Sequence, residues 1–321
     1  MKGPVLALAG GVGGAKLALG LSHVLPPQQL VVLANTGDDD VFHGLNVSPD
    51  LDTLMYTLAG LANPATGWGV AGDTFGVLEM LKRYGADSWF GLGDRDLATH
   101  IERTRLLREG RTLSEVTHYL CGKLAVKPTL APMSNDPVRT LVETDQGTLA
   151  FQDYFVKYRC EPSIRSVRFE GAAQAQASPV FQRALNSAGA VVYCPSNPVV
   201  SIGPILALPG VREQLTAFRG PRVAVSPIVG EQALRGPAAK MLLALGEEVR
   251  CVGVARRLAG YSGADIRHIC QRATQLPFLE SIRTGQARDI SMADVERAMT
   301  EVKPSVSPRM LERFQAFAAT T

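Results

Sequence analysis

The chain has 321 residues, of which 46% are hydrophobic and 20% are charged, a composition that excludes an intrinsically disordered protein and suits one large or two smaller folded domains. Its net charge of +3 comes from interspersed lysines and arginines and not from a basic block, so nucleic acid is not an expected partner. The five cysteines lack the spacing of a zinc site or a disulfide framework, and no apolar run approaches about 18 residues, so we expect no membrane span and a cytoplasmic location.

The N-terminal segment is typical of a buried strand, a tight turn and a helix. Val5–Ala9 is apolar, Gly10–Gly14 contains four glycines, and a second apolar run starts at Lys16. Glycines let a ligand approach the backbone, and free N–H groups at the start of a helix favour an anion, so this turn is a candidate phosphate site. Its spacing matches neither the Walker A pattern nor the dinucleotide fingerprint, and the alternative is a plain connection in an α/β sheet.

A second short strand, Leu30–Ala34, precedes a group of aspartates. Asp38 follows this strand closely, and Ser48 with Pro49 predicts a helix start that places Asp50 and Asp52 in the first turn. Acidic residues in a first turn are also favoured by the helix dipole in any protein. Because the carboxyl ends of parallel strands form ligand sites, we interpret the aspartates as candidate ligands of Mg²⁺, a metal that prefers oxygen.

Two helices follow, which end near Tyr84 and near Arg108. The second is preceded by a polar stretch in which Asp94, Arg95 and His100 are candidates for substrate binding, since an arginine can hold a phosphate bidentately. The alternatives are structural: Asp94 caps the helix, Arg95 pairs with a neighbouring acid, and His100 is a satisfied core residue.

The rest of the first 230 residues predicts a return to alternating helices and strands. A helix over about 113–126 and three short strands that form a meander or insertion come first, namely Leu130–Met133, Arg139–Glu143 and Thr148–Gln152. A helix over Pro179–Ser187 and strands over Ala190–Cys194 and Arg222–Ser226 complete the pattern. We therefore expect an α/β fold with a Rossmann-like, mostly parallel sheet, helices on both faces, and one shared cleft where the strands end.

Several motifs resemble those of the 2-phospho-L-lactate transferase (CofD-like) family of coenzyme F420 biosynthesis over about residues 3–257. They are Gly10–Lys16, Asn35–Asp39, Ser48–Thr53, Leu92–His100, Pro195–Ile205 and Ser226–Gly230. The resemblance implies an enzyme that moves a phosphoenolpyruvyl, 2-phospholactyl or 3-phosphoglyceryl group from a guanosine diphosphate-linked donor to the deazaflavin Fo and releases GMP. It also implies Mg²⁺ as the metal and a homodimer. The carried acid stays open, although Trp89–Asp96 favours phosphoenolpyruvate.

The resemblance also assigns roles to single residues. Asp38, Asp50 and Asp52 are the expected metal-binding and catalytic set, in which Asp52 contacts the metal or the ribityl chain of Fo. The acceptor substrate is expected at Asp52, Asp94, Arg95 and His100. The nucleotide is expected at Gly10, Gly11, Gly13, Gly14, Lys16, Ser196, Asn197, Pro198, Gly203 and Gly230. Gly91 replaces a lysine of some archaeal members, which leaves the contacts of the deazaflavin ring open.

The C-terminal segment departs from this pattern. Residues 258–321 resemble the helical lid of an AAA+ ATPase, with Ser262 and Ser291 as helix caps and a last helix to Phe317. The chain has no Walker A loop upstream, so we do not expect ATP hydrolysis. We expect two domains, 1–257 and 258–321. The alternative function is a non-catalytic nucleotide-binding or assembly module whose helical tail docks a partner.

Overall fold

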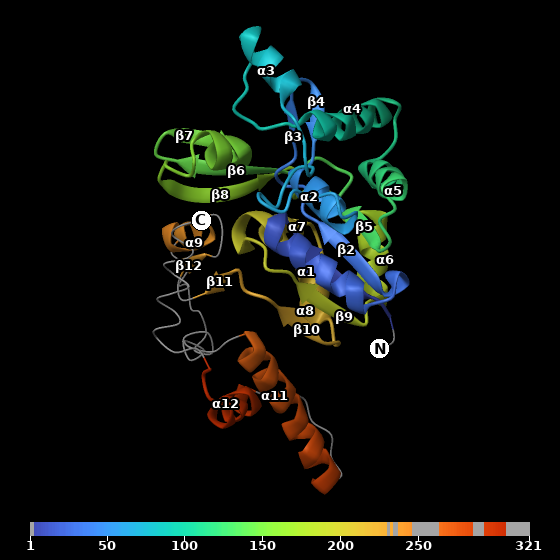
Figure 1. The fold of residues 1–321 in the computed structure, drawn as a ribbon, viewed down its shortest axis with the longest axis vertical. Coiled ribbons are helices and arrows are strands. Elements are labelled where there is room, and N and C mark those ends of the chain that lie inside the picture. The colour runs from blue at the N-terminus through green and yellow to red at the C-terminus, as the bar shows by residue number, and fades with distance from the viewer. Residues whose placement is uncertain (1–2, 230–231, 234–236, 246–262, 285–291, 306–321) are drawn as a thin grey trace. The chain divides into compact units, whose positions relative to one another are not determined.

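The computed structural model describes residues 3–229, 232–233, 237–245, 263–284 and 292–305 (Figure 1). The chain divides into two compact units. The first comprises Met1–Ile228 with Ala233–Glu248, and the second Val229–Gln232 with Val249–Thr321. The domain boundary expected at residue 257 lies outside the described residues and stays a prediction.

A five-stranded parallel sheet forms the centre of the first unit, in the order β10-β9-β1-β2-β5 (Figure 1). Its strands are β1 (Val5–Ala9), β2 (Leu30–Ala34), β5 (Thr129–Pro132), β9 (Ala190–Tyr193) and β10 (Arg222–Ala224). The chain builds outward from β1 in one direction through β2 and β5, and in the other through β9 and β10. In such sheets ligands bind beyond the carboxyl ends of the strands where the order reverses, here between β1 and β9. The expected α/β fold is confirmed.

Side chains of β1 alternate between two cores because successive residues of a strand point to opposite faces. Ala7 belongs to the core beneath α1 (Gly11–Val24), α2 (Pro49–Leu58), α4 (Asp94–Arg108) and α5 (Leu113–Lys123). Leu8 belongs to the core beneath α6 (Pro179–Ser187), α7 (Gly203–Ala207) and α8 (Val211–Ala217). Both faces are thus covered, which explains why β1 and β2 are continuously apolar in the sequence.

Among the described residues, three smaller sheets lie outside the central one: β11 (Ile228–Val229) with β12 (Gln232–Ala233), and two antiparallel sheets. A hairpin joins β3 (Asp40–Phe42) to β4 (Leu45–Val47), and β6 (Arg139–Thr144) lies between β7 (Gly147–Ala150) and β8 (Ile164–Glu170). The expected meander is partly wrong: Leu130–Met133 belongs to the central sheet as β5, and Gln152 follows β7 in a helical turn. Strand β8 has no alternating apolar pattern that would predict it, because polar residues occupy both of its faces.

The other described elements before residue 263 are short. They are the helical turns η1 (Pro27–Gln29), η2 (Asp153–Lys157) and η3 (Pro198–Ile202), helices α3 (Gly76–Arg83) and α9 (Ala238–Ala244), and the two-residue strands β11 and β12.

The second unit contains α11 (Gly263–Thr284) and α12 (Met292–Glu301), which confirms a helical C-terminal segment. Ile269 and Ala273 pack with Ala298 and Met299 in a small apolar core. The expected caps Ser262 and Ser291 and the expected last helix lie outside the described residues. Within the described parts of the chain, no helix combines the length and the apolar character that a membrane crossing requires.

Candidate functional site

Two buried aspartates meet at the carboxyl end of β2 and the start of α2. Asn35, which follows β2 and is fully buried, donates from Nδ2 to Oδ1 of Asp38 over 3.1 Å and to Oδ2 of Asp50 over 3.0 Å. Its own Oδ1 accepts the Gly37 N–H over 2.8 Å, which closes the turn that leads to Asp38. One neutral amide therefore holds both carboxylates, and we refer to Asp38 and Asp50 as the carboxylate pair.

The other oxygens of the carboxylate pair also accept from neutral amides. The backbone N–H of Gly11 donates to Oδ1 of Asp50 over 2.6 Å, and Nε2 of Gln152 donates to Oδ2 of Asp38 over 3.3 Å. Burial raises the pKa of Asp50 to about 6, against the hydrogen bonds from Asn35 and Gly11 that lower it. Burial and then the charge of Asp50 raise the pKa of Asp38 well above its usual range. The pair thus lacks a cationic side chain among the described residues that bond to it.

A third carboxylate, Asp39, lies beside the pair. Its Oδ2 accepts from the Ser48 hydroxyl over 2.6 Å, while its buried Oδ1 has no hydrogen-bond partner among the described residues. Burial raises the pKa of Asp39 well above its usual range, and the hydrogen bond from Ser48 opposes this. Ser48 stands at the expected helix start but uses its hydroxyl for Asp39 instead of capping α2.

The glycine turn after β1 is closed by contacts across the sheet. Ser196, which follows β9, accepts from the Gly10 N–H over 2.9 Å and donates to the Gly10 carbonyl over 2.8 Å. Because Gly11 donates to Asp50, the first two amides of the turn are both hydrogen-bonded within the protein, and their expected role at the nucleotide stays a prediction. A Cβ on Gly13 would lie 2.2 Å from the Pro195 carbonyl oxygen, so close approach of the β9 loop requires this glycine.

Asp52, unlike the carboxylate pair, is bound by a cationic side chain. Arg103 of α4 forms a bidentate ion pair with it, with Nη1 3.1 Å from Oδ2 and Nη2 in contact with Oδ1. Both side chains are buried, Arg103 at 2% exposure and Asp52 at 5%. The guanidinium of Arg103 thus contacts both carboxylate oxygens of Asp52, and the expected role of Asp52 at the metal or at the acceptor stays a prediction.

His100 belongs to the same buried network. Its Nε2 lies 3.2 Å from Oδ1 of Asp96, which also accepts the Tyr56 hydroxyl over 2.7 Å. Its Nδ1 lies 3.2 Å from Nη1 of Arg103. Burial opposes ionisation of Asp96, yet His100, Tyr56 and Arg103 hold the pKa of that carboxyl below its usual value. His100 is 1% exposed, and its buried Nε2 makes no well-aligned hydrogen bond within the described residues, so its expected contact with the acceptor stays a prediction.

Asp94 and Arg95 also make structural contacts. Asp94 begins α4 but caps α3, accepting from the Gly76 N–H over 3.0 Å and the Val77 N–H over 3.0 Å. Asp73, which the sequence did not single out, accepts from the Arg95 N–H over 2.8 Å at the start of α4. Nη1 of Arg95 donates to the Ala71 carbonyl over 3.2 Å. Asp94, at the start of α4, therefore caps α3, and Asp73, which precedes α3, caps α4. Arg95 and Asp94, both described, form no ion pair.

The other expected nucleotide residues are spread over α1 and the β9 loop. Lys16 is exposed on α1, and Pro198 is exposed at the start of η3. Asn197 caps η3 by accepting from the Val199 N–H over 2.9 Å, and Gly203 begins α7. Gly230 lies outside the described residues. Gly14 packs beside Ser196, where an added Cβ would lie 2.6 Å from its Oγ.

Magnesium fits the chemistry of the carboxylate pair. No group of three or more His, Cys, Asp or Glu side chains forms a metal site by itself within the described ranges. Mg²⁺ usually takes only one or two carboxylates and completes its shell with phosphate oxygens and water. Two buried carboxylates held only by neutral amides are therefore a suitable anionic donor set for that ion.

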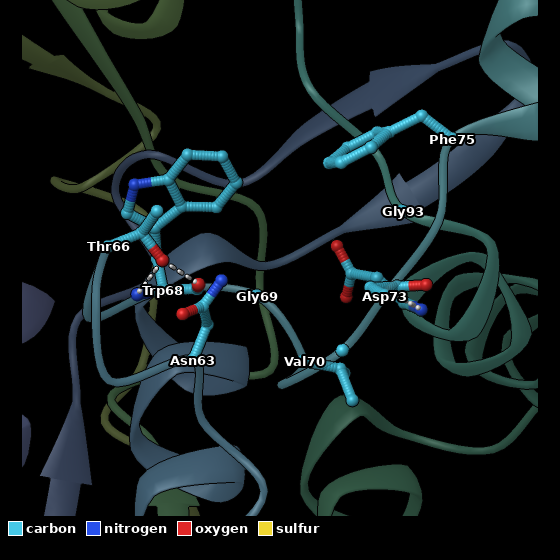
Figure 2. A pocket seen from close by; sticks show the side chains of 10 residues that line it. Asn63, Thr66, Trp68, Gly69, Val70, Asp73, Phe75 and Gly93 are labelled. Carbon is cyan, nitrogen blue, oxygen red and sulfur yellow. Dashed lines mark hydrogen bonds between the residues drawn. The ribbon is translucent and has the colours of Figure 1, made fainter.

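Two pockets in the first unit are lined by other residues than the carboxylate pair. One has a volume of about 210 Å³, and Figure 2 shows the rings of Trp68 and Phe75 on opposite sides of it, with Gly93 and Asp73 at its wall. The second, of about 320 Å³, is lined by Phe42, His43, Trp89, Phe90 and three carboxylates, Asp40, Asp87 and Asp153. Neither is lined by Asp38 or Asp50, so pocket shape alone would not have identified the pair.

Comparison with known proteins gives the same family as the sequence motifs. The description of the 2-phospho-L-lactate transferase CofD family matches residues 5–271, and that of an AAA+ lid domain matches residues 253–295. The chain is 48% identical over 257 residues to a phosphoenolpyruvate transferase of Streptomyces griseus subsp. griseus, covering 78% of this chain and 81% of the relative. It is 41% identical over 251 residues to a 2-phospho-L-lactate transferase of Methanosarcina mazei, covering 78% and 82%.

A solved structure shows a similar fold. A crystal structure of a UPF0052 family protein from Bacillus halodurans matches with a TM-score of 0.50 at 17% identity, covering 70% of this chain and 68% of that one. At this identity the likeness concerns the fold alone.

Proposed function

Because the chain belongs to the 2-phospho-L-lactate transferase CofD family and is therefore a transferase of that type, we propose that it transfers a phospho-three-carbon-acid group from a guanosine diphosphate-linked donor to the deazaflavin Fo and releases GMP. The observation that carries the proposal at the site is the buried carboxylate pair, Asp38 and Asp50, at the carboxyl ends of the strands. Similarity to relatives named phosphoenolpyruvate transferases favours phosphoenolpyruvate as the carried acid.

In the proposed reaction, an acceptor hydroxyl oxygen forms a bond to the phosphorus that carries the three-carbon acid. The bond from this phosphorus to the bridging diphosphate oxygen breaks, and GMP leaves with that electron pair. We assign Asp39 as the group that takes the hydroxyl proton, because its Oδ1 has no partner among the described residues and burial raises its pKa.

Asp38 and Asp50 would hold Mg²⁺, which would supply positive charge to the diphosphate. Asn35, Gly11 and Gln152 orient the two carboxylates. We place the donor at the switch point, between the loop after β1 and the loop of Ser196 and Asn197 after β9.

The pocket between Trp68 and Phe75 is our candidate for the planar ring of the acceptor, since aromatic side chains stack on planar rings. Asp52 and His100 act in this scheme through the network that joins α2 to α4, and not by contact with the substrate. A homodimer and a cytoplasmic location remain part of the proposal.

The test is mass spectrometry of the purified full-length protein with Fo, Mg²⁺ and each guanylated donor. The proposal expects GMP and one matching phosphodiester product, which Asp38→Asn and Asp50→Asn each abolish. GMP binding by a folded protein that forms no product from any donor would instead support the nucleotide-binding module with a docking tail.

A further inference from the structure

Gln152 connects the small antiparallel sheet to the carboxylate pair. It lies two residues after the end of β7 and is 5% exposed, and its Nε2 lies 3.3 Å from Oδ2 of Asp38. The opposite oxygen of Asp38 accepts from Asn35. The two amides therefore hold the carboxylate of Asp38 from both sides.

The backbone around Gln152 is fixed by its neighbours. Phe151 and Tyr154 are both buried in a separate apolar core with Val142, Ile164 and Val200. Phe151 also stacks on Phe155 at 5.4 Å between ring centroids. A side chain between two such anchored residues has little freedom to leave Asp38, because moving it would require moving the rings.

The same apolar core reaches the carboxylate pair by a second route. Val200 belongs to it, and the Val200 carbonyl accepts from Nδ2 of Asn35 over 3.3 Å. The core thus contacts both amides that hold Asp38, one through the Gln152 side chain and one through the Val200 backbone. A single packed cluster sets the orientation of the carboxylate from two directions.

The chemistry of Gln152 suits this task. An amide donates a hydrogen bond to Asp38 without neutralising it, whereas a lysine or arginine there would compete with a cation for the carboxylate. We propose that Gln152 is a positioning residue, which holds Asp38 in the orientation in which it binds a divalent cation. This inference rests on the magnesium site of the proposed function.

The experiment compares Gln152→Leu with Gln146→Leu, a matched control at the exposed β6–β7 turn. Binding of Mn²⁺ alone to the full-length protein is measured by electron paramagnetic resonance, and thermal unfolding of the metal-free proteins is measured alongside. Loss of a hydrogen bond to a charged acceptor predicts an increase of about tenfold in the Mn²⁺ Kd for Gln152→Leu and none for Gln146→Leu. Gln152→Met, which keeps the unbranched stem, is the second variant if Gln152→Leu does not fold.

The Asp38→Asn background separates positioning from a merely structural role. If Gln152 acts through Asp38, Gln152→Leu changes the Mn²⁺ Kd less than twofold in that background. A Gln152→Leu protein that binds Mn²⁺ like the wild type, while Asp38→Asn binds it weakly, would overturn the inference and leave the magnesium site standing. Unchanged Mn²⁺ binding in Asp38→Asn would overturn the magnesium site itself, and the inference with it.

Discussion

Replacing Asp52 by alanine should destabilise the protein, because it leaves Arg103 without its ion-pair partner. Arg103 is 2% exposed, and the carboxylate of Asp52 accepts hydrogen bonds from both terminal nitrogens of Arg103. Removing one partner of a buried ion pair costs about 3–5 kcal/mol, a large part of the roughly 5–15 kcal/mol by which most domains are stable. For a unit of this size, the expected fall in Tm is about 6–20 °C.

The assay is urea unfolding of the metal-free protein at pH 7, with differential scanning fluorimetry for the Tm. Asp52→Ala combined with Arg103→Met is the informative control, since replacing both charges by apolar groups of similar volume is often close to neutral. The double variant should therefore be more stable than Asp52→Ala alone. If the free energy of unfolding of Asp52→Ala lies within about 1 kcal/mol of the wild-type value, the ion pair of Asp52 and Arg103 does not stabilise the packing of α2 on α4.

Three further predictions concern the pair, the glycine turn and the helix caps. Because burial raises the pKa of Asp50 from 3.8 to about 6, its contribution to the stability of the metal-free protein is present below pH 4 and lost as pH rises through 6. The free energy of unfolding, measured in urea, should therefore fall by up to about 3 kcal/mol over this range in the wild type but not in Asp50→Asn, and the same pH dependence in both proteins would contradict this. Gly13→Ala should destabilise the protein by about 1–3 kcal/mol, because the added Cβ collides with the Pro195 carbonyl, whereas Gly20→Ala, with nothing within 4 Å of its Cβ, should stabilise α1 by up to about 1 kcal/mol. The same change in the free energy of unfolding for both variants, measured in urea, would count against the close contact at Gly13. Asp94→Ala should expose α3 to limited proteolysis with little change in overall Tm, and an unaltered cleavage rate would remove Asp94 as its cap.

The sequence predicted those features that depend on local pattern. Strands β1 and β2 are apolar because both faces of the sheet are covered, and that pattern is visible without a structure. Asp38 and Asp50 were expected to lie together because residues that follow parallel strands reach one edge of the sheet.

The partners of these residues could not be predicted, because they depend on tertiary packing. Gln152 reaches Asp38 from a sequence separation of 114 residues, and no motif marks it. Arg103 stands in an ordinary-looking helix, and only the approach of α4 to α2 shows that it neutralises Asp52. Asp94 was assigned to the helix that it begins, since a sequence cannot show that it caps the preceding one.

The hydrogen bonds between Gly10 and Ser196 also bear on the order in which the protein assembles. The two residues are 186 positions apart, so the turn after β1 is closed only when β9 has joined the sheet. A ribosome that has released the first 189 residues has already made every aspartate of the site, yet not the strand that completes the turn. Contacts of such long range slow folding, and a nascent chain would reach binding competence only late in synthesis.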